Sequence, residues 1–359
     1  MISRLSNLYE LKGYNRFKMS KFEEYDLYVK NKDFLVSDNI ITFNDIGGKL
    51  LALKPDVTLS IVKNTLKSSE LQKVYYNENV YRVSEQAGSF KEIMQVGLEC
   101  VGEIDTYLTY EVISLAVSSL MEISENCVLD LSDLKVLSSV LNSAIDDPDL
   151  KKQLLSLISL KSAHEIDRFK DKIEEKYLTA LKEIALLHGE AEKVLENLSD
   201  IIKDVADEGV LCELKDICAL LKANGLLHKV QIDFSVISDI KYYNGIVFKG
   251  FVDGVGKDVL SGGRYDNLIR KMGNQKGAIG FAVYLDRLEN LMSEVSDYDA
   301  DVAVLYDNDS DLTALSKFVN DTAKENLRVV ALKAKPERLK VRKIYKITGK
   351  EVSILEDNA

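Results

Sequence analysis

The clearest candidates for ligand chemistry lie in one stretch of the chain, YRVSEQAGSFKEIMQVGLE at residues 81–99. This stretch is predicted to form two strands joined by a loop, with Arg82 near its start and Gln95 and Glu99 near its end. Because Gln95 and Glu99 are four residues apart, strand alternation turns both to one face, where a carboxylate is costly unless another group pairs with it. A lone arginine on a hairpin is more often a solvated or ion-paired charge than a ligand, so a site here needs support from other segments.

Three other segments place polar or small residues where apolar strands would be expected. LALKPDVTLS sets an aspartate and a threonine between apolar residues, and DIKYYNGIVF has two adjacent tyrosines before an Asn-Gly pair. LSGGRYDNL supplies a Gly-Gly pair that would let a ligand approach the backbone. Each feature alone has an ordinary structural explanation, such as a capping aspartate, a core tyrosine or a hairpin turn, but their combination favours a shared binding site. The residues singled out are Asp56, Thr58, Tyr242, Tyr243, Gly262 and Gly263.

Length and composition indicate a folded protein with more than one part. The chain has 359 residues, 46% of them hydrophobic, which is enough for two domains or for one large domain with an insertion. Neither an N-terminal basic-then-apolar signal nor a membrane-length apolar run is visible, so a cytoplasmic protein is expected. With 4 cysteines that lack C-x-x-C spacing and 3 histidines, we expect no metal site, disulfide framework or cofactor.

The charge balance argues against nucleic acid as a partner. The net charge is −11, whereas sequence-independent nucleic-acid affinity depends on lysine and arginine contacts that release counterions. The lysine-rich stretch at residues 332–350 is the one local exception, and it is interpreted as a solvated face. No nucleic-acid or membrane partner is therefore predicted.

Hydrophobic periodicity divides the chain into four pieces and predicts an α+β fold. Residues 1–128 mix strand-like runs with one amphipathic stretch, and residues 129–229 repeat apolar residues at helical spacings of three and four. Strand signals return in residues 230–295, so the helical piece is interpreted as an insertion into a single core. Residues 296–359 are predicted to form a small β-α-β segment followed by a hairpin.

Taken in order, these segments resemble the catalytic core of the class II aminoacyl-tRNA synthetases, specifically the histidyl branch. KPDVT is similar to the R-P-E-G-T element, and residues 80–99 resemble the second class signature. DIKYYNGIVF with LSGGRYDNL is similar to the histidine-specific R-G-L-D-Y-Y-T-G and its glycine-rich partner, and AIGFAVYLDRL resembles the third signature. The resemblance covers about residues 1–125 and 230–292 and implies an antiparallel sheet flanked by helices.

The resemblance also implies a pocket for histidine. Histidine offers a cation, an anion and a ring with two nitrogens, which call for acceptors, a guanidinium and an acid–phenol pair. Tyr242, Gly262 and Gly263 would complete the pocket. The implied assignments are Asp56, Thr58 and Gln95 for the α-ammonium, Arg82 for the carboxylate, and Glu99 with Tyr243 for the imidazole nitrogens.

Departures from the synthetase pattern predict that catalysis is lost. Ser238 stands where the synthetases have the arginine of R-G-L-D-Y-Y, and the loop at residues 86–89 lacks basic residues, with only Lys91 near. Tyr284 replaces a small glycine beside the nucleotide, although Arg287 persists. Adenylate formation depends on positioned cations and metal, so it should be very slow here.

A kept pocket with lost catalysis resembles the regulatory subunits of ATP phosphoribosyltransferase. KPDVT and YYNGIVFKGF look like that family's R-P-D-M-T and Y-Y-T-G-I-I-F-K-G-Y. The resemblance implies a non-catalytic protein that binds L-histidine, partners the short-form catalytic subunit, and dimerises through residues 11–29 within a hetero-octamer. Two alternatives remain: an enzyme making histidinyl-adenylate for a non-tRNA acceptor, and a histidine-binding module serving a different partner.

Overall fold

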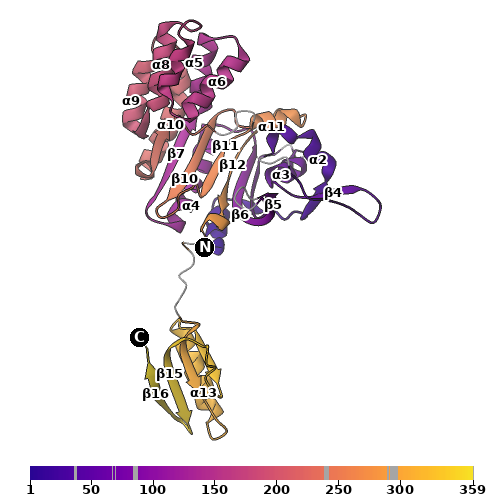
Figure 1. The fold of residues 1–359 in the computed structure, drawn as a ribbon, viewed down its shortest axis with the longest axis vertical. Helices are drawn as coiled ribbons and strands as arrows, with labels where there is room; N and C mark the ends of the chain where they lie inside the picture. The colour runs from indigo at the N-terminus through magenta and orange to yellow at the C-terminus, as the bar shows by residue number, and fades with distance from the viewer. Residues whose placement is uncertain are drawn as a thin grey trace. The chain divides into compact units, whose positions relative to one another are not determined.

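The computed structural model describes residues 1–35, 39–66, 68, 70–83, 88–237, 242–288, 291 and 298–358. The chain divides into two compact units, Met1–Leu288 and Glu289–Ala359 (Figure 1). Each unit contains its own hydrophobic clusters and is described by itself. Within the described ranges, no helix is long and apolar enough to cross a membrane.

The first unit is built on a nine-stranded sheet with the order β1-β5-β6-β12-β11-β10-β7-β9-β8. From β5 to β7 every neighbouring pair is antiparallel, whereas β1–β5 and β7–β9 are parallel. The expected α+β fold is present, but the sheet is mixed, because strand partners far apart in sequence leave no local pattern that reveals their direction. The strands are β1 (Asn15–Arg16), β5 (Gln72–Val83), β6 (Phe90–Gly102), β7 (Cys127–Asp133), β8 (His188–Glu190), β9 (Val230–Asp233), β10 (Ile246–Val252), β11 (Leu260–Arg264) and β12 (Gly277–Tyr284).

The two faces of this sheet differ in character. One face packs against α4 (Thr106–Ile123), with Leu98, Phe248 and Phe281 in the same buried cluster as that helix. The opposite face carries polar side chains, since Glu78 pairs with Gln95 across β5 and β6, and Gly280 of β12 lies opposite Glu99. This polar face, formed by adjacent strands, is where the candidate site is built.

Helices fill the chain between β7 and β9, as the periodicity predicts, and pack into the same hydrophobic cluster as the sheet. The periodicity predicts helical structure throughout residues 129–229, but the structure interrupts it with β8 (His188–Glu190). The interruption falls at Gly189, whose φ of +128° is incompatible with a helix. The helices of this segment are α5 (Leu134–Ala144), α6 (Pro148–Ser159), α7 (Ala163–Ile166), α8 (Glu175–Leu186), α9 (Ala191–Ile202) and α10 (Cys212–Ala223).

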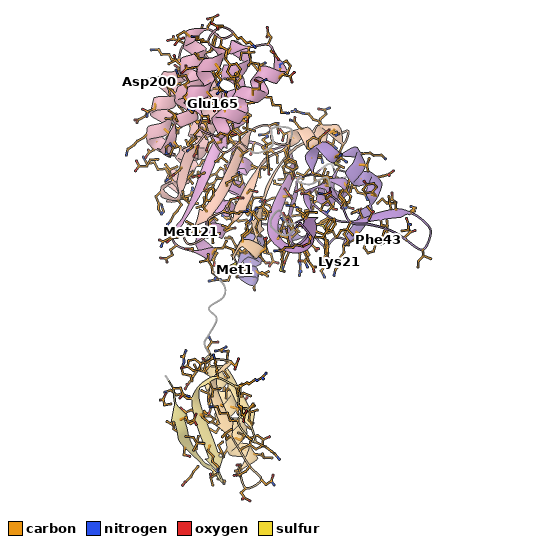
Figure 2. The ribbon with its side chains drawn as sticks, viewed as in Figure 1. Met1, Lys21, Phe43, Met121, Glu165 and Asp200 are labelled. Atoms are coloured by element: carbon orange, nitrogen blue, oxygen red, sulfur yellow. The ribbon has the colours of Figure 1, made fainter. Side chains whose placement is uncertain are left out.

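Smaller elements complete the first unit. A three-stranded sheet has the order β2-β4-β3, and Phe43 of β3 is labelled in Figure 2. Its ring meets that of Phe22, on the other edge strand β2, edge to face with centroids 5.5 Å apart. The helix that follows this sheet begins at Thr58, next to the polar face of the large sheet. These elements are α1 (Ile2–Glu10), β2 (Phe22–Glu24), α2 (Tyr25–Lys30), β3 (Thr42–Asn44), β4 (Leu50–Leu53), α3 (Thr58–Thr65) and α11 (Asp266–Lys271).

The second unit contains the expected β-α-β segment followed by a hairpin. Its sheet has the order β14-β13-β15-β16, with β13 parallel to both of its neighbours. The helix α13 is capped by Asp311, whose carboxylate accepts the backbone N–H groups of Thr313 and Ala314. The elements are β13 (Ala300–Leu305), α13 (Leu312–Lys324), β14 (Val329–Leu332), β15 (Val341–Thr348) and β16 (Glu351–Asp357).

Candidate functional site

A cavity of about 370 Å³ lies over the polar face of the large sheet. Strands β5, β6, β10, β11 and β12 form its wall, together with residues at the start of α3 and the residues just before β10. All of the predicted site residues other than the two glycines line this cavity. Those residues are Asp56, Thr58, Arg82, Gln95, Glu99, Tyr242 and Tyr243.

Glu99 is the buried acid of the cavity, with only 2% of its surface exposed. The Thr58 hydroxyl donates to Oε1 at 2.7 Å, and the Tyr265 hydroxyl donates to Oε2 at 2.5 Å. Burial raises the pKa of the Glu99 carboxyl to about 8, while those two hydrogen bonds oppose the shift and the charge of Asp56 adds to it. At neutral pH this carboxyl is therefore mainly protonated and can donate or accept a hydrogen bond.

The Glu99 carboxyl fits only because its neighbour on β12 is a glycine. A Cβ atom on Gly280 would lie 1.8 Å from Glu99 Oε2 and 2.4 Å from the Leu98 carbonyl oxygen. The register between β6 and β12 therefore explains the glycine in the third signature segment, because Gly280 leaves room for the carboxyl of Glu99 on the neighbouring strand.

Asp56 and Arg82 form a second polar group in the wall. Arg82 Nε donates to the Pro55 carbonyl at 2.6 Å, and its Nη2 lies 3.6 Å from Asp56 Oδ2. Asp56 Oδ1 also accepts the Leu59 N–H at 3.0 Å, so this residue stabilises the first turn of α3 as well as facing the cavity. Burial raises the pKa of Asp56, while the Arg82 charge and the backbone N–H groups of α3 lower it.

Gln95 has unused hydrogen-bonding capacity. Its side chain is 2% exposed, and its amide nitrogen is buried without a hydrogen-bond partner in the part of the chain that the structure describes. A buried polar atom of this kind is uncommon and calls for an explanation such as a bound ligand. Since an amide can present either its oxygen or its nitrogen, Gln95 can serve a ligand cation or a ligand acceptor.

Tyr242 and Tyr243 lie next to a hydrogen-bonded pair, Asn244 and Asp266, which we call the polar clamp. Asn244 Oδ1 accepts the Asp266 N–H at 2.8 Å, and its Nδ2 lies 3.3 Å from Asp266 Oδ2. The rings of Tyr242 and Tyr243 meet at a centroid distance of 4.6 Å, and Tyr242 also contacts Tyr265 at 5.5 Å. The clamp thus fixes an aromatic wall beside Glu99.

Gly262 and Gly263 do not line the cavity, although a direct ligand approach was predicted for them. A Cβ on Gly263 would lie 2.7 Å from Tyr243 Cδ1, and one on Gly262 would lie 2.4 Å from the Gly280 carbonyl oxygen. Both positions require glycine for packing: Gly263 seats the Tyr243 ring, and Gly262 lets the strands approach.

Other residues line the cavity but were missing from the predicted set. Tyr265 directly follows the Gly-Gly-Arg motif, and Lys249 interrupts an apolar strand, so both carried a local signal. The remaining residues reach the cavity because of the order of the strands in the sheet, which no local sequence pattern predicts. The main additions are Tyr76, Lys249, Ser261, Tyr265 and Tyr284.

Tyr284 of the third signature segment lines the cavity, and Arg287 of the same segment is engaged by neighbouring groups. The Tyr284 hydroxyl lies 2.6 Å from Ser261 Oγ, and the Arg287 guanidinium stacks 4.2 Å from the centre of the Tyr284 ring. Arg287 also pairs with Asp258 at 2.8 Å. Ser238 and residues 86–87, two of the predicted departures, lie outside the described residues.

The sequence and the fold match known proteins. The family model described as histidyl-tRNA synthetase matches residues 1–288. An ATP phosphoribosyltransferase regulatory subunit of Alkaliphilus metalliredigens is 30% identical over 297 residues, covering 80% of this chain and 75% of the relative. A regulatory subunit of Caldanaerobacter subterraneus is 32% identical over 286 residues, covering 77% of this chain and 73% of the relative.

Solved structures agree with this assignment at the level of the fold. A protein of Bacillus halodurans described as an ATP phosphoribosyltransferase regulatory subunit/histidyl-tRNA synthetase superposes with a TM-score of 0.75 at 22% identity, covering 92% of this chain and 86% of that chain. The histidyl-tRNA synthetase of Nostoc gives 0.77 at 16% identity, covering 96% and 86%. The fold is thus that of the class II aminoacyl-tRNA synthetase-like proteins, and the chain belongs to the histidyl-tRNA synthetase-like family of ATP phosphoribosyltransferase regulatory subunits.

Proposed function

We propose that this chain is a non-catalytic regulatory subunit of ATP phosphoribosyltransferase, and that its cavity binds L-histidine as a feedback effector. The observation that carries the proposal is the cavity around Glu99, in which a buried acid, a buried amide with a free donor and an aspartate–arginine pair surround one small space. Its volume suits a ligand of amino-acid size. The names of the curated relatives and a solved complex of ATP phosphoribosyl transferase from Thermotoga maritima, similar at a TM-score of 0.63, support the choice of partner.

Each group of histidine then has a receiving side chain. The imidazole nitrogens lie between Glu99 and Tyr243, one as donor and one as acceptor. The α-ammonium is held by Asp56, Thr58 and Gln95, of which the aspartate contributes the charge. Arg82 faces the carboxylate, so every polar group of the ligand is hydrogen-bonded on leaving water.

Binding is expected to be strongest between about pH 6.5, where a free imidazole titrates, and pH 8, where Glu99 titrates. Below this window the imidazole and Glu99 are both protonated, and above it both lack the proton, so their hydrogen bond is lost on either side. Calorimetric titration with L-histidine across this range measures the profile. An affinity that keeps increasing well above pH 8 would exclude a shared proton at Glu99.

Catalysis by the chain itself is disfavoured by the same cavity. An adenylate-forming enzyme needs a free cation and room for a nucleotide. Here the Tyr284 ring lines the cavity, and Arg287 is paired with Asp258. The alternative of a histidinyl-adenylate-forming enzyme predicts histidine-dependent exchange of pyrophosphate into ATP. We expect no such exchange.

Regulation requires that histidine change the contact with the catalytic subunit. In the proposed assembly, homodimers of this chain join catalytic subunits in a hetero-octamer, and the ligand reorders the residues around 242–245 and 262–265. A coupling free energy of about 1–3 kcal/mol would change affinities roughly 5- to 150-fold.

The test is the steady-state rate of the matching short-form catalytic subunit, with and without this chain, across a histidine titration. We expect the chain to increase the rate and histidine to reverse that increase. If the chain leaves the rate unchanged at all histidine concentrations, the regulatory function is wrong, and co-purification from the source cells would then seek the different partner of a histidine-binding module.

A further inference from the structure

Lys249 is a cation in the cavity wall that the predicted site does not use. Its side chain is half-buried and lines the cavity from β10. It makes no hydrogen bond or ion pair with any residue that the structure describes. The one charged side chain in the otherwise apolar strand segment IVFKGF thus lines the cavity without a partner among the described residues.

Two hydroxyl groups lie beside it. Lys249 is directly opposite Ser261 of β11, and Ser261 is opposite Ala282 of β12. Strand alternation puts all three on the face that carries Glu99 and Gly280. The Ser261 hydroxyl bonds to that of Tyr284 at 2.6 Å, so one proton of the pair remains to donate to a ligand.

The position of Lys249 separates it from the acid of the cavity. Strands β6, β12, β11 and β10 are consecutive neighbours in the sheet (Figure 1). Three steps of about 4.8 Å and an offset of two residues along the strands place the backbones of Glu99 and Lys249 roughly 16 Å apart. Both residues line the same cavity, so a ligand in it can lie between the acid and the cation.

Charge balance leaves Lys249 uncompensated. Asp33 pairs with Lys271 at 3.0 Å, and Asp56 faces Arg82 at 3.6 Å. Glu99 is mainly neutral at pH 7 because burial raises its pKa to about 8. When Lys271, which pairs with Asp33 from outside the cavity lining, is included, the described charges balance except for that of Lys249, and this favours an anion beside it.

Arg82 is less suited than Lys249 to bind an anion, because its guanidinium already interacts with other groups of the protein. Its Nε donates to the Pro55 carbonyl, and its Nη2 faces Asp56, so an incoming anion has to compete with a carboxylate. No such competitor is in contact with Lys249 among the described residues.

We propose that Lys249, with the hydroxyl pair of Ser261 and Tyr284 beside it, forms an anion-binding subsite of this cavity. The inference rests on the proposed function and adds a binding residue to it. The anion is either the carboxylate of the bound amino acid or a separate small anion such as phosphate. Both present oxygen atoms that accept hydrogen bonds from the Lys249 ammonium and from a hydroxyl group.

The test is calorimetric titration of the whole chain and of Lys249→Met, which keeps an unbranched side chain one atom shorter and removes its charge. The ligands are L-histidine, histamine, which lacks the carboxylate, and inorganic phosphate. If the carboxylate occupies the subsite, Lys249→Met lowers histidine affinity at least about tenfold and leaves histamine affinity unchanged. If a separate anion occupies it, histidine affinity stays and phosphate binding is lost.

Two variants serve as controls. Lys257→Met makes the same change at an exposed position in the turn after β10 and should alter none of these affinities. Lys249→Arg keeps the charge and should retain most of the binding. The subsite is wrong if Lys249→Met changes no affinity, or lowers histidine and histamine affinity equally. Failure of the unmodified chain to bind histidine would instead contradict the proposed function.

Discussion

Replacement of Glu99 by alanine should lower the affinity for L-histidine by at least about 30-fold, and histidine inhibition of the catalytic subunit should weaken accordingly. The substitution removes the partner of the imidazole at a buried position, and it leaves the hydroxyls of Thr58 and Tyr265 without their acceptor. Such a loss costs about 2–3 kcal/mol, which corresponds to roughly 30- to 150-fold in affinity. Tyr243→Phe, which removes one hydroxyl, should have a smaller effect of the same sign.

The measurement is histidine binding by calorimetry together with the histidine titration of the assembled enzyme. Glu103→Ala is the matched control, since Glu103 is exposed and follows Glu99 by four residues. Retention of histidine affinity in Glu99→Ala would show that the imidazole is not bound at this acid. Loss of both activation and inhibition would indicate a folding defect rather than a binding effect.

Gly280→Ala should destabilise the first unit and also abolish the geometry of the Glu99 site. The added Cβ would lie 2.4 Å from the Leu98 carbonyl oxygen, which is backbone and cannot turn away, and 1.8 Å from Glu99 Oε2. Overpacking of this kind typically costs about 1–3 kcal/mol. Urea unfolding should therefore show a lower midpoint, and histidine binding should be weakened even where the variant is folded.

Gly256→Ala is the control for this change. A Cβ at Gly256 would meet no atom within 4 Å, so the same methyl group should alter stability by less than about 0.5 kcal/mol. If Gly280→Ala is as stable as Gly256→Ala, the close approach of β12 to Glu99 in this register is wrong.

Local patterns predicted the elements better than they predicted how the elements combine. The β-α-β segment and hairpin of the second unit follow from periodicities of two and three to four residues over short windows. In the helical segment the periodicity was also sound, but β8 was missed, because three residues are too few to show alternation. The parallel pairs at β1 and β9 were missed for a different reason: pairing direction depends on residues distant in the chain.

Glu99, the acid at the centre of the site, also has some properties that local sequence patterns predict and others that they do not. Gln95 and Glu99 were placed on one face by strand alternation alone, and their register across β5 and β12 agrees with that placement. That Glu99 titrates near pH 8 has no counterpart in the sequence, since the shift comes mainly from burial under side chains of other segments. The same holds for Asp56, whose carboxylate both accepts a backbone N–H in the first turn of α3 and faces Arg82.

The sequence by itself determined the α+β class, the helical segment and most of the side chains that meet in the cavity, because motif residues and alternation are local properties. Only the tertiary structure decided that Gly262 and Gly263 serve packing and that Tyr265, Lys249 and Tyr284 share the wall with Glu99. The lateral order β6-β12-β11-β10 brings these residues together, and it joins strands that are far apart in the chain. Burial and charge in the cavity depend on that order, so no reading of one segment at a time can predict them.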